Sequence, residues 1–358
     1  YVRDTISAAD YSIANLECAV TSDPSTPHPY KSYTFFSYPE TLAGLTDAGF
    51  DGVDMANNHV FDYLEDGVED SINSVSGVNL DQTGAGLNES DAAGTTIDAT
   101  SQGVPVALQG FSTLRKDGSS LTKYLLIALD PDKAGALEAT SPNMTDFLTA
   151  EAGSTFAVPM IHGGVEYSSY PANNMRSIFV SLIKQGAGMV VAHHTHTVHG
   201  IGIVDPGTGP HFVLMSLGNF IFDQSTFETT QSMIAVADVE NKQVTRLQLI
   251  PVHVERYVPK LLAGDWLARA GRQLGHLSST LPKTPSGSAS ADGLTGATVF
   301  QSGSRVLAFK SSSQFEKKDT DESLPPLTLK SGATGVIDYK RTGPADSLAA
   351  FKTTTSAA

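Results

Sequence analysis

The feature that most constrains the fold is an alternation, up to about residue 277, of short apolar runs with amphipathic stretches of helical period. This alternation is typical of layered α/β domains. Helices are predicted over residues 38–48, 64–75 and 171–185. In the third, Met175, Phe179 and Leu182 recur at helical spacing behind Pro171, which suits a first helical turn. The first 277 residues are therefore predicted to form one α/β domain.

Nine short runs are predicted as strands, at residues 11–16, 52–56, 104–109, 124–129, 156–161, 189–192, 212–216, 233–239 and 244–252. Several of them are continuously apolar, which indicates strands buried on both faces. The last two alternate apolar and polar residues, as half-exposed antiparallel strands do. Residues 278–298 are rich in Ser, Pro and Gly and are predicted to be a linker, because they offer too little apolar surface to offset the entropy of ordering. Residues 299–358 are predicted to form a small β-rich appendage or a flexible tail.

Charge and cysteine content exclude several classes of function. The chain has 23 Lys and Arg against 38 Asp and Glu, a formal charge of −15, and no evident basic patch. Such a balance repels nucleic acids and anionic lipid surfaces. The single cysteine, Cys18, excludes an intramolecular disulfide and a thiolate-cluster metal site. Any metal would therefore be held by His, Asn, Asp or Glu side chains.

Histidines gather in the segment VVAHHTHTVHG, which contains His193, His194, His196 and His199 directly after an apolar run. If the chain stays extended, alternation places His194 and His196 on one face and His193 on the other. Two imidazoles at i and i+2 beyond a buried strand are well spaced for metal ligation. The alternative is a polar loop whose histidines only form hydrogen bonds.

Two further apolar runs also end in polar side chains. One is followed by Asn57, Asn58 and His59, and the other by His162, with Glu166 four residues later. Ligands gather beyond the carboxyl ends of strands in α/β sheets, so these groups are predicted to converge with the histidine segment. Taken singly, an Asn-Asn pair is also typical of turns, and a lone histidine at a strand end is often structural.

Glu17 follows a further apolar run and could add a carboxylate to this set. Carboxylate, amide and imidazole ligands suit two divalent ions of Mn, Fe or Zn. A two-metal site of this kind can clamp a phosphoryl group and activate a water for in-line attack. His59 is predicted to protonate the leaving oxygen or to stabilise developing charge.

Six blocks, in this order, resemble the bacterial capsule-synthesis CapA/PgsA family. They are NLE (15–17), GFDGVDMANNHVFDY (49–63), GAG (84–86), HGGVEY (162–167), AHHTH (192–196) and SLGNFIFD (216–223). The resemblance extends over residues 1 to about 262. It implies a calcineurin-like metallophosphoesterase fold, which is a four-layered α/β/β/α sandwich. It also implies a role in making or exporting poly-γ-glutamate capsule.

The resemblance further implies residue roles. Glu17 takes a metal-bridging position, Asn58 is a ligand and His59 the catalytic acid, while His162, His194 and His196 match the remaining ligands. Five other polar residues in or beside these blocks are predicted to orient the ligands or contact substrate, with turn or capping roles as the alternative: Asn57, Asp62, Glu166, Asn219 and Asp223.

The sequence also departs from the family pattern. The family opens with a strand ending in Gly-Asp that supplies a first metal carboxylate, and this sequence begins after that point. Gly163 stands where the family usually has Trp, which would alter the pocket wall. By resemblance, the expected location is the cell envelope, through an upstream anchor or export segment.

The expected partners are a phosphoester or polyglutamate-related substrate and other capsule-synthesis membrane proteins, without nucleic acid. Two functions stay open at this point. One is a metal-dependent phosphoesterase, and the other is a non-catalytic capsule component that retains the fold.

Overall fold

The computed structural model describes residues 1–101, 103–114, 133–281, 293–302, 305–309, 335–341 and 348–355. Contacts between residues divide the chain into two units. The N-terminal unit comprises Val2–Gly164 and Gln185–His194. The C-terminal unit comprises Tyr1, Val165–Lys184 and Thr195–Ala358. Each unit is described by itself.

The N-terminal unit alternates helices and strands along the chain. Its helices are α1 (Arg3–Ile6), the 3-10 turn η1 (Pro39–Thr41), α2 (Leu42–Ala48), α3 (Leu64–Gly77), α4 (Glu89–Ala93) and α5 (Ser141–Ala150). Its strands are β1 (Ile13–Asn15), β2 (Ala19–Val20), β3 (Phe36–Ser37), β4 (Gly52–Asp54), β5 (Asp81–Thr83), β6 (Ala85–Gly86), β7 (Ile97–Ser101), β8 (Val104–Ser112), β9 (Gly135–Ala136), β10 (Phe156–His162) and β11 (Val190–His193).

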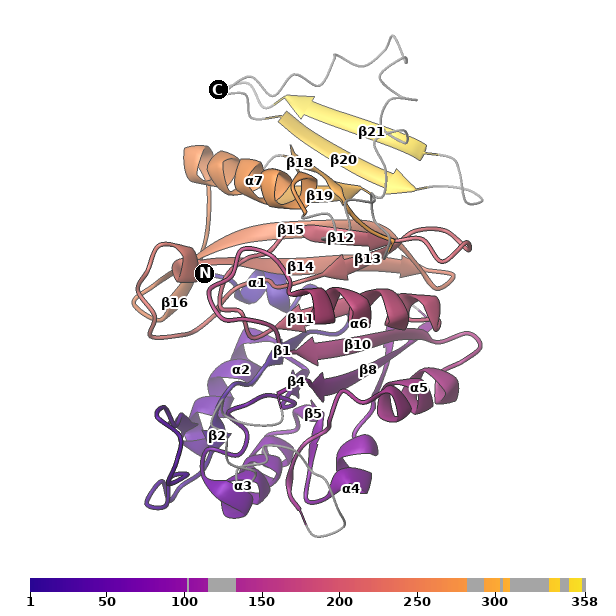
Figure 1. Ribbon diagram of the computed structural model, residues 1–358. Coiled ribbons are helices and arrows are strands. Elements are labelled where there is room, and N and C mark those ends of the chain that lie inside the picture. The colour runs from indigo at the N-terminus through magenta and orange to yellow at the C-terminus, as the bar shows by residue number, and fades with distance from the viewer. Residues whose placement is uncertain are drawn as a thin grey trace. The chain divides into compact units, whose positions relative to one another are not determined.

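Parallel strands set the geometry of this unit. Strands β1, β4 and β5 form a three-stranded parallel sheet, and β8, β10 and β11 run parallel in another, with β7 antiparallel to β8. All seven residues of β10 are buried, as its continuous apolar sequence predicts. In Figure 1, α3 lies beside β2 and β5, which it contacts. The carboxyl ends of β1, β4, β10 and β11 carry the polar residues discussed below.

One hydrophobic cluster holds the part of this unit around β4, α2 and α3 together. It is contributed by helices, strands and the turn after β4, and its fully or nearly fully buried members are Val20, Leu42, Val53, Met55, Ala56, Val60, Val68, Val75, Leu80, Ala85, Ala134 and Ala136. Burying a large aliphatic side chain contributes about 1.5–3 kcal/mol relative to leaving it exposed. The turn that follows β4 is therefore anchored by apolar packing beneath its polar residues.

The C-terminal unit is richer in antiparallel strands. Its helices are α6 (Asn173–Lys184), the 3-10 turn η2 (Glu228–Thr230) and α7 (Gly264–Ser279). Its strands are β12 (Ile201–Val204), β13 (His211–Leu214), β14 (Gln231–Glu240), β15 (Gln243–Glu255), β16 (Val258–Leu261), β17 (Leu294–Gly296), β18 (Thr298–Ser302), β19 (Arg305–Phe309), β20 (Gly335–Arg341) and β21 (Leu348–Thr355). The long hairpin β14–β15 extends through β19 to β18, and α7 contacts β18, β12 and β15 (Figure 1).

The prediction of a mixed α/β fold is confirmed, and most predicted elements are present with shifted ends. The predicted helix at 171–185 is α6, which buries Met175, Phe179 and Leu182. The strand predicted at 124–129 lies outside the described residues. Within the predicted linker, residues 278–298, the structure has the last two residues of α7, strand β17 and the first residue of β18, while the domain boundaries themselves remain predictions. No helix in the described part of the chain is long and apolar enough to cross a membrane.

Candidate metal centre

Glu17 is held in place by two asparagines beyond the end of β1. Its Oε2 accepts a hydrogen bond from Asn15 Nδ2 at 2.8 Å. The Asn15 Oδ1 in turn accepts from Asn57 Nδ2 at 3.1 Å. These two hydrogen bonds hold Glu17 Oε2 in place, and the position of the other carboxylate oxygen, Oε1, follows from it.

Asn57 shapes the turn that follows β4. It is fully buried, and its Oδ1 accepts the backbone N–H of His59 at 3.0 Å while its Nδ2 also donates to the carbonyl of Leu16 at 2.9 Å. An asparagine that bonds the backbone two residues ahead is a common turn device. Asn57 therefore shapes the turn that presents Asn58 and His59 beyond the strand end, and its role at a metal site remains a prediction.

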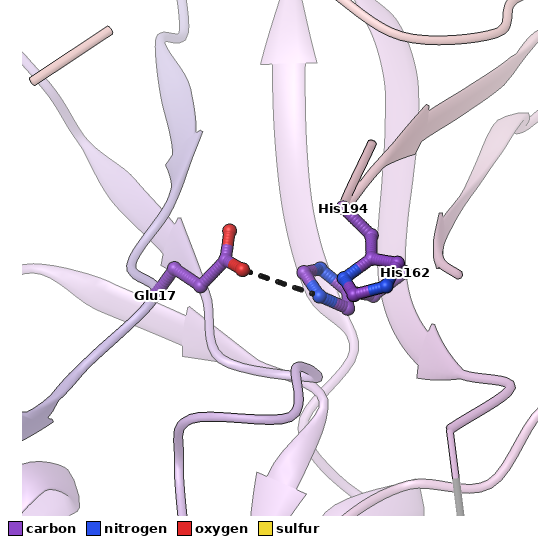
Figure 2. Close-up of side chains that lie close together, drawn as sticks. All are labelled: Glu17, His162 and His194. Atoms are coloured by element: carbon purple, nitrogen blue, oxygen red, sulfur yellow. Dashed lines mark ion pairs between the residues drawn. The ribbon is translucent and has the colours of Figure 1, made fainter. Parts of the chain in front are cut away.

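His162 is the centre of the cluster. It ends β10, is fully buried, and its Nε2 lies 2.7 Å from Asn58 Oδ1 and 3.6 Å from Glu17 Oε1. The ring of His194 lies 4.9 Å from the ring of His162, centroid to centroid. Ligand atoms of Glu17, His162 and His194 all lie within 4.8 Å of one another, and Figure 2 shows the carboxylate facing the two imidazoles.

This group fits a divalent ion. Nitrogen and oxygen ligands lie about 2.0–2.2 Å from Zn²⁺, so two ligands of one ion are at most about 4.4 Å apart. The Glu17–His162 and Asn58–His162 separations of 3.6 and 2.7 Å fall within that limit, while the bound of 4.8 Å for the whole group with His194 is slightly above it. Carboxylate, amide and imidazole donors also match the preferences of Mn, Fe and Zn. The residues present therefore suit a metal at the site that the sequence predicted.

His59 lies in a separate hydrogen-bonded group that starts at Asp62. The buried Asp62 carboxylate contacts His59 Nδ1 at 2.7 Å, accepts the backbone N–H of Phe35 at 2.5 Å, and forms an ion pair with the Lys31 ammonium. Lys31 Nζ also donates to the carbonyl of Asn58 at 2.5 Å. The ring of Phe35 packs on the imidazole of His59, with centroids 4.3 Å apart.

This arrangement places the Nδ1 proton of His59 toward Asp62. A carboxylate that orients an imidazole in this way fixes its tautomer. The Asp62 carboxylate thus orients the His59 ring, and Lys31 joins the pair to the Asn58 carbonyl. The predicted role of Asp62 at a metal site remains a prediction. Sequence reasoning did not identify Lys31, whose position in a Tyr-rich loop gave no signal of burial.

The extended chain on which the expected alternation of His193, His194 and His196 depended is not present beyond His193. The ring of His193 lies 5.1 Å from that of His162, and the two Nδ1 atoms are 2.9 Å apart, so His193 and His194 both contact His162. The reason is that β11 ends at His193 and His194 has a φ of 104°. Alternation of side chains applies only while the chain stays extended. A non-glycine residue at positive φ is uncommon and costs about 1–3 kcal/mol.

Asp54, the last residue of β4, is also part of this cluster and was missed. It is fully buried, and its Oδ2 lies 3.1 Å from His193 Nε2. Its sequence signal was an acidic residue within an otherwise apolar run, immediately before the Asn57 turn.

Four of the predicted site residues belong to the C-terminal unit: Glu166, His196, Asn219 and Asp223. His196 Nδ1 contacts Asn219 Oδ1 at 2.9 Å, and Asn219 is nearly buried and donates to the carbonyl of Thr229 at 3.1 Å. Asn219 therefore orients His196 within this unit. Glu166 and Asp223 are not buried. The metal role of His196 and the substrate roles of Glu166 and Asp223 remain predictions.

The half-buried Cys18 and the buried His199 have shifted pKa values. Burial, reinforced by the nearby Asp62 and Glu17 carboxylates, raises the pKa of the Cys18 thiol to about 12. Burial lowers the pKa of His199 to about 4, against a smaller opposing effect of its bond to the Ser168 carbonyl. The raised pKa disfavours the reactive thiolate form of Cys18, and the lowered pKa keeps His199 neutral at neutral pH.

The sequence places the chain in a known family. Residues 1–224 match the sequence model of the bacterial capsule synthesis protein PGA_cap family, and the chain belongs to that family. The class predicted from the six motif blocks is thereby confirmed.

Among particular proteins, two curated relatives carry the name CapA. The chain is 28% identical over 267 residues to "PGA biosynthesis protein CapA" of Bacillus subtilis (strain 168), covering 75% of this chain and 67% of that protein. It is 27% identical over 225 residues to "Capsule biosynthesis protein CapA" of Bacillus anthracis, covering 62% of this chain and 52% of that protein. The chain thus spans about two thirds and about half of their lengths.

Among solved structures, the chain is similar to a crystal structure of a hypothetical protein from Thermus thermophilus. The similarity has a TM-score of 0.39 at 12% identity, and it covers 73% of this chain and 88% of that chain.

Proposed function

We propose that this chain is a CapA-type, metal-dependent phosphoesterase that acts in the biosynthesis or export of a poly-γ-glutamate capsule. The observation that carries the proposal is the convergence of Glu17, His162 and His194 within 4.8 Å. These residues come from three separate strand ends of the N-terminal unit. Family membership and the names of the two relatives support the capsule role.

The proposed roles of the site residues are metal binding, positioning of a ligand and proton transfer. Glu17, Asn58, His162 and His194 would hold a divalent ion, and Asn15 and Asn57 keep Glu17 oriented toward it. Divalent ions bound there would activate a phosphoryl group and the attacking water as Lewis acids. His59, with its Nδ1 turned to Asp62, would deliver a proton from Nε2 to the leaving oxygen.

Other parts of the proposal follow the family resemblance. We expect two Mn, Fe or Zn ions, with His196 as a further ligand. The fold would be the four-layered metallophosphoesterase sandwich. The protein would work at the cell envelope, beside other capsule-synthesis membrane proteins, on a phosphoester or polyglutamate-related substrate.

The first test separates metal binding from catalysis. The purified chain is loaded with Mn²⁺, its metal content is measured by mass spectrometry, and hydrolysis of bis(p-nitrophenyl) phosphate is followed. His194→Ala should lower the metal content, because it removes one ligand. His59→Ala should keep the metal and lose about 100-fold or more in rate, the range expected for a general acid.

The matched control is His276→Ala, which removes an exposed imidazole on α7 in the C-terminal unit. It should change neither metal content nor rate. Full metal loading of the wild-type chain without hydrolysis would overturn the proposed phosphoesterase activity. It would favour the alternative, a non-catalytic binding component of capsule assembly. Unchanged metal content in His194→Ala would remove that residue from the site.

A further inference from the structure

We infer that Tyr33 binds the leaving group of the phosphoester and selects a leaving group that carries a flat aromatic ring. This inference rests on the proposed function and deepens it, because it names a substrate class for the side of the site where His59 acts. Tyr33 lies in residues 28–38, HPYKSYTFFSY, which we call the aromatic segment. Five of its eleven residues are Tyr or Phe, whereas aromatic residues make up 8% of the whole chain.

The aromatic segment is attached at two points to the turn that carries His59. The Asp62 carboxylate accepts the backbone N–H of Phe35 at 2.5 Å and forms an ion pair with the Lys31 ammonium. Lys31 Nζ also donates to the carbonyl of Asn58 at 2.5 Å. Hydrogen bonds with one charged partner are about twice as strong as neutral ones. The segment is therefore fixed against this turn at residues 31 and 35.

These two attachments confine Tyr33. The ring of Phe35 packs on the imidazole of His59, with the two centroids 4.3 Å apart. Because the chain extends by at most about 3.6 Å per residue, the Cα of Tyr33 lies within about 7 Å of the Cα atoms of both Lys31 and Phe35. Tyr33 is nevertheless 73% exposed. The attachments thus present an exposed tyrosine next to the turn of His59.

Packing accounts for the other exposed aromatic residues of the segment. Phe36 packs edge to face on Tyr38 and on Tyr63, with centroids 5.3 and 5.6 Å apart. Tyr30 packs on a neighbouring histidine at 6.3 Å. Tyr33 is more exposed than any of these and has no ring contact among the residues that the structure describes. Its ring therefore has both faces open to a ligand.

The place of Tyr33 indicates which part of a substrate it meets. A single exposed tyrosine is common on protein surfaces, so exposure alone assigns no role. In the proposed reaction His59 gives a proton to the leaving oxygen, so the leaving group lies on the His59 side of the phosphorus. The aromatic segment packs on His59 through Phe35, and Tyr33 is its most exposed ring. Tyrosine stacks on aryl rings and nucleobases and has few torsions to immobilise.

Two substrates locate the contact in the Mn²⁺-loaded chain. Bis(p-nitrophenyl) phosphate has a ring on both ester oxygens, whereas ethyl p-nitrophenyl phosphate has one on the leaving group alone. Tyr33→Leu should raise KM about 2- to 10-fold for both, the range for one aromatic pair. The kcat should not change, because such a contact is equal in the ground state and the transition state. Tyr33→Phe keeps the ring and should behave as the wild-type chain does.

The matched control is Tyr257→Leu, which removes a tyrosine of similar exposure, 60%, between β15 and β16 in the C-terminal unit. It should leave KM unchanged for both substrates. An unchanged KM in Tyr33→Leu, or a rise of equal size in Tyr257→Leu, would overturn the inference. A rise with bis(p-nitrophenyl) phosphate alone would do so too, because it would place Tyr33 at the group that stays on the phosphorus.

Inhibition distinguishes the two sources of an aromatic ring, a nucleobase and a simple aryl group. Adenosine 5′-monophosphate and phenyl phosphate are each compared with ethyl phosphate as inhibitors of the hydrolysis. The ring that fits should inhibit more strongly than ethyl phosphate in the wild-type chain and lose this advantage in Tyr33→Leu. An advantage that persists in the variant would show that the ring binds elsewhere and would contradict the inference.

Binding without turnover separates this inference from the proposed function. Phenylphosphonate and methylphosphonate have no ester bond to hydrolyse. Calorimetry with Mn²⁺ present should show phenylphosphonate binding about 2- to 10-fold more tightly to the wild-type chain, and Tyr33→Leu should abolish the difference. Equal binding of the two, or binding of neither, would sink the inference. A difference that depends on Tyr33 in a chain that hydrolyses no ester would overturn the phosphoesterase alone.

Discussion

The buried ionisable residues of the N-terminal unit show why its polar cluster is stable without solvent. Asp62 is fully buried, yet Lys31, the Phe35 N–H and His59 each contact its carboxylate. A buried charge is tolerated when its partners replace the hydrogen bonds of water. The same residue fixes His59, so stability and the proposed chemistry depend on one carboxylate.

His199 makes the free energy of unfolding depend on pH, and this effect can be measured separately from metal binding. Its folded-state pKa of about 4 lies below the ordinary value of 6.5, because burial disfavours the imidazolium. Between these pH values the unfolded chain binds a proton that the folded chain does not, so stability falls as pH decreases through this range. We expect a loss of about 2 kcal/mol at about pH 5 relative to neutral pH.

The substitution His199→Gln isolates this effect. Glutamine can place its own Nε2 donor where His199 Nε2 faces the Ser168 carbonyl, at 2.9 Å, but it does not titrate. Urea unfolding of the variant should therefore lose less stability between neutral and acidic pH than the wild-type chain, by about 2 kcal/mol. The exposed His276→Gln serves as control. Equal pH dependence in all three proteins would contradict the assignment.

At the scale of elements, the packing of α7 depends on two close approaches by glycines. A Cβ added at Gly296 of β17 would lie 1.8 Å from the carbonyl oxygen of Ser278, and one at Gly200 would lie 2.6 Å from the Leu277 backbone. Ser278 Oγ also accepts the backbone N–H of Ile201, at 2.9 Å. The backbone of the last turn of α7 therefore packs directly against the backbone at Gly200 and Gly296.

Gly296→Ala should consequently destabilise the protein. The methyl group meets backbone rather than a movable side chain, so we expect a loss of about 1–3 kcal/mol or more in the free energy of unfolding. Gly275→Ala in α7 is the matched control, because its Cβ would meet nothing closer than 3.8 Å outside the helix's own backbone. Removing a helical glycine there should add up to about 1 kcal/mol. Similar effects of the two substitutions in thermal and urea unfolding would refute this packing.

The sequence predicted the elements whose pattern is local and missed those that depend on backbone detail. The apolar run of β10 identified both the buried strand and His162 at its end. The turn at His194 could not be foreseen, because a φ of 104° on a histidine has no sequence signature, and with it the position of His193 was missed. Strand β12 was also missed, since a four-residue run containing glycine is a weak strand signal.

At the scale of the whole molecule, charge limits how the proposed substrate could bind. The chain carries a formal charge of −15, and poly-γ-glutamate is itself a polyanion. Long-range repulsion between them acts over about 30 Å at 0.01 M salt and is screened to about 8 Å at physiological ionic strength. An extended polymer therefore cannot be held along the surface by electrostatic attraction, and contact is favoured only where bound cations offset the charge.

We therefore expect binding of poly-γ-glutamate to require divalent ions. In fluorescence anisotropy with labelled polymer, the wild-type chain in EDTA should show no binding at about 0.01 M salt, where repulsion has its longest range. Added Mn²⁺ should produce binding in the wild-type chain and much less in Glu17→Gln, which removes the charge that attracts the ion. Asp51→Asn makes the same change in net charge on an exposed residue and should bind as the wild-type chain does. Tight binding in EDTA that weakens with salt would instead reveal a basic groove and contradict single-site recognition.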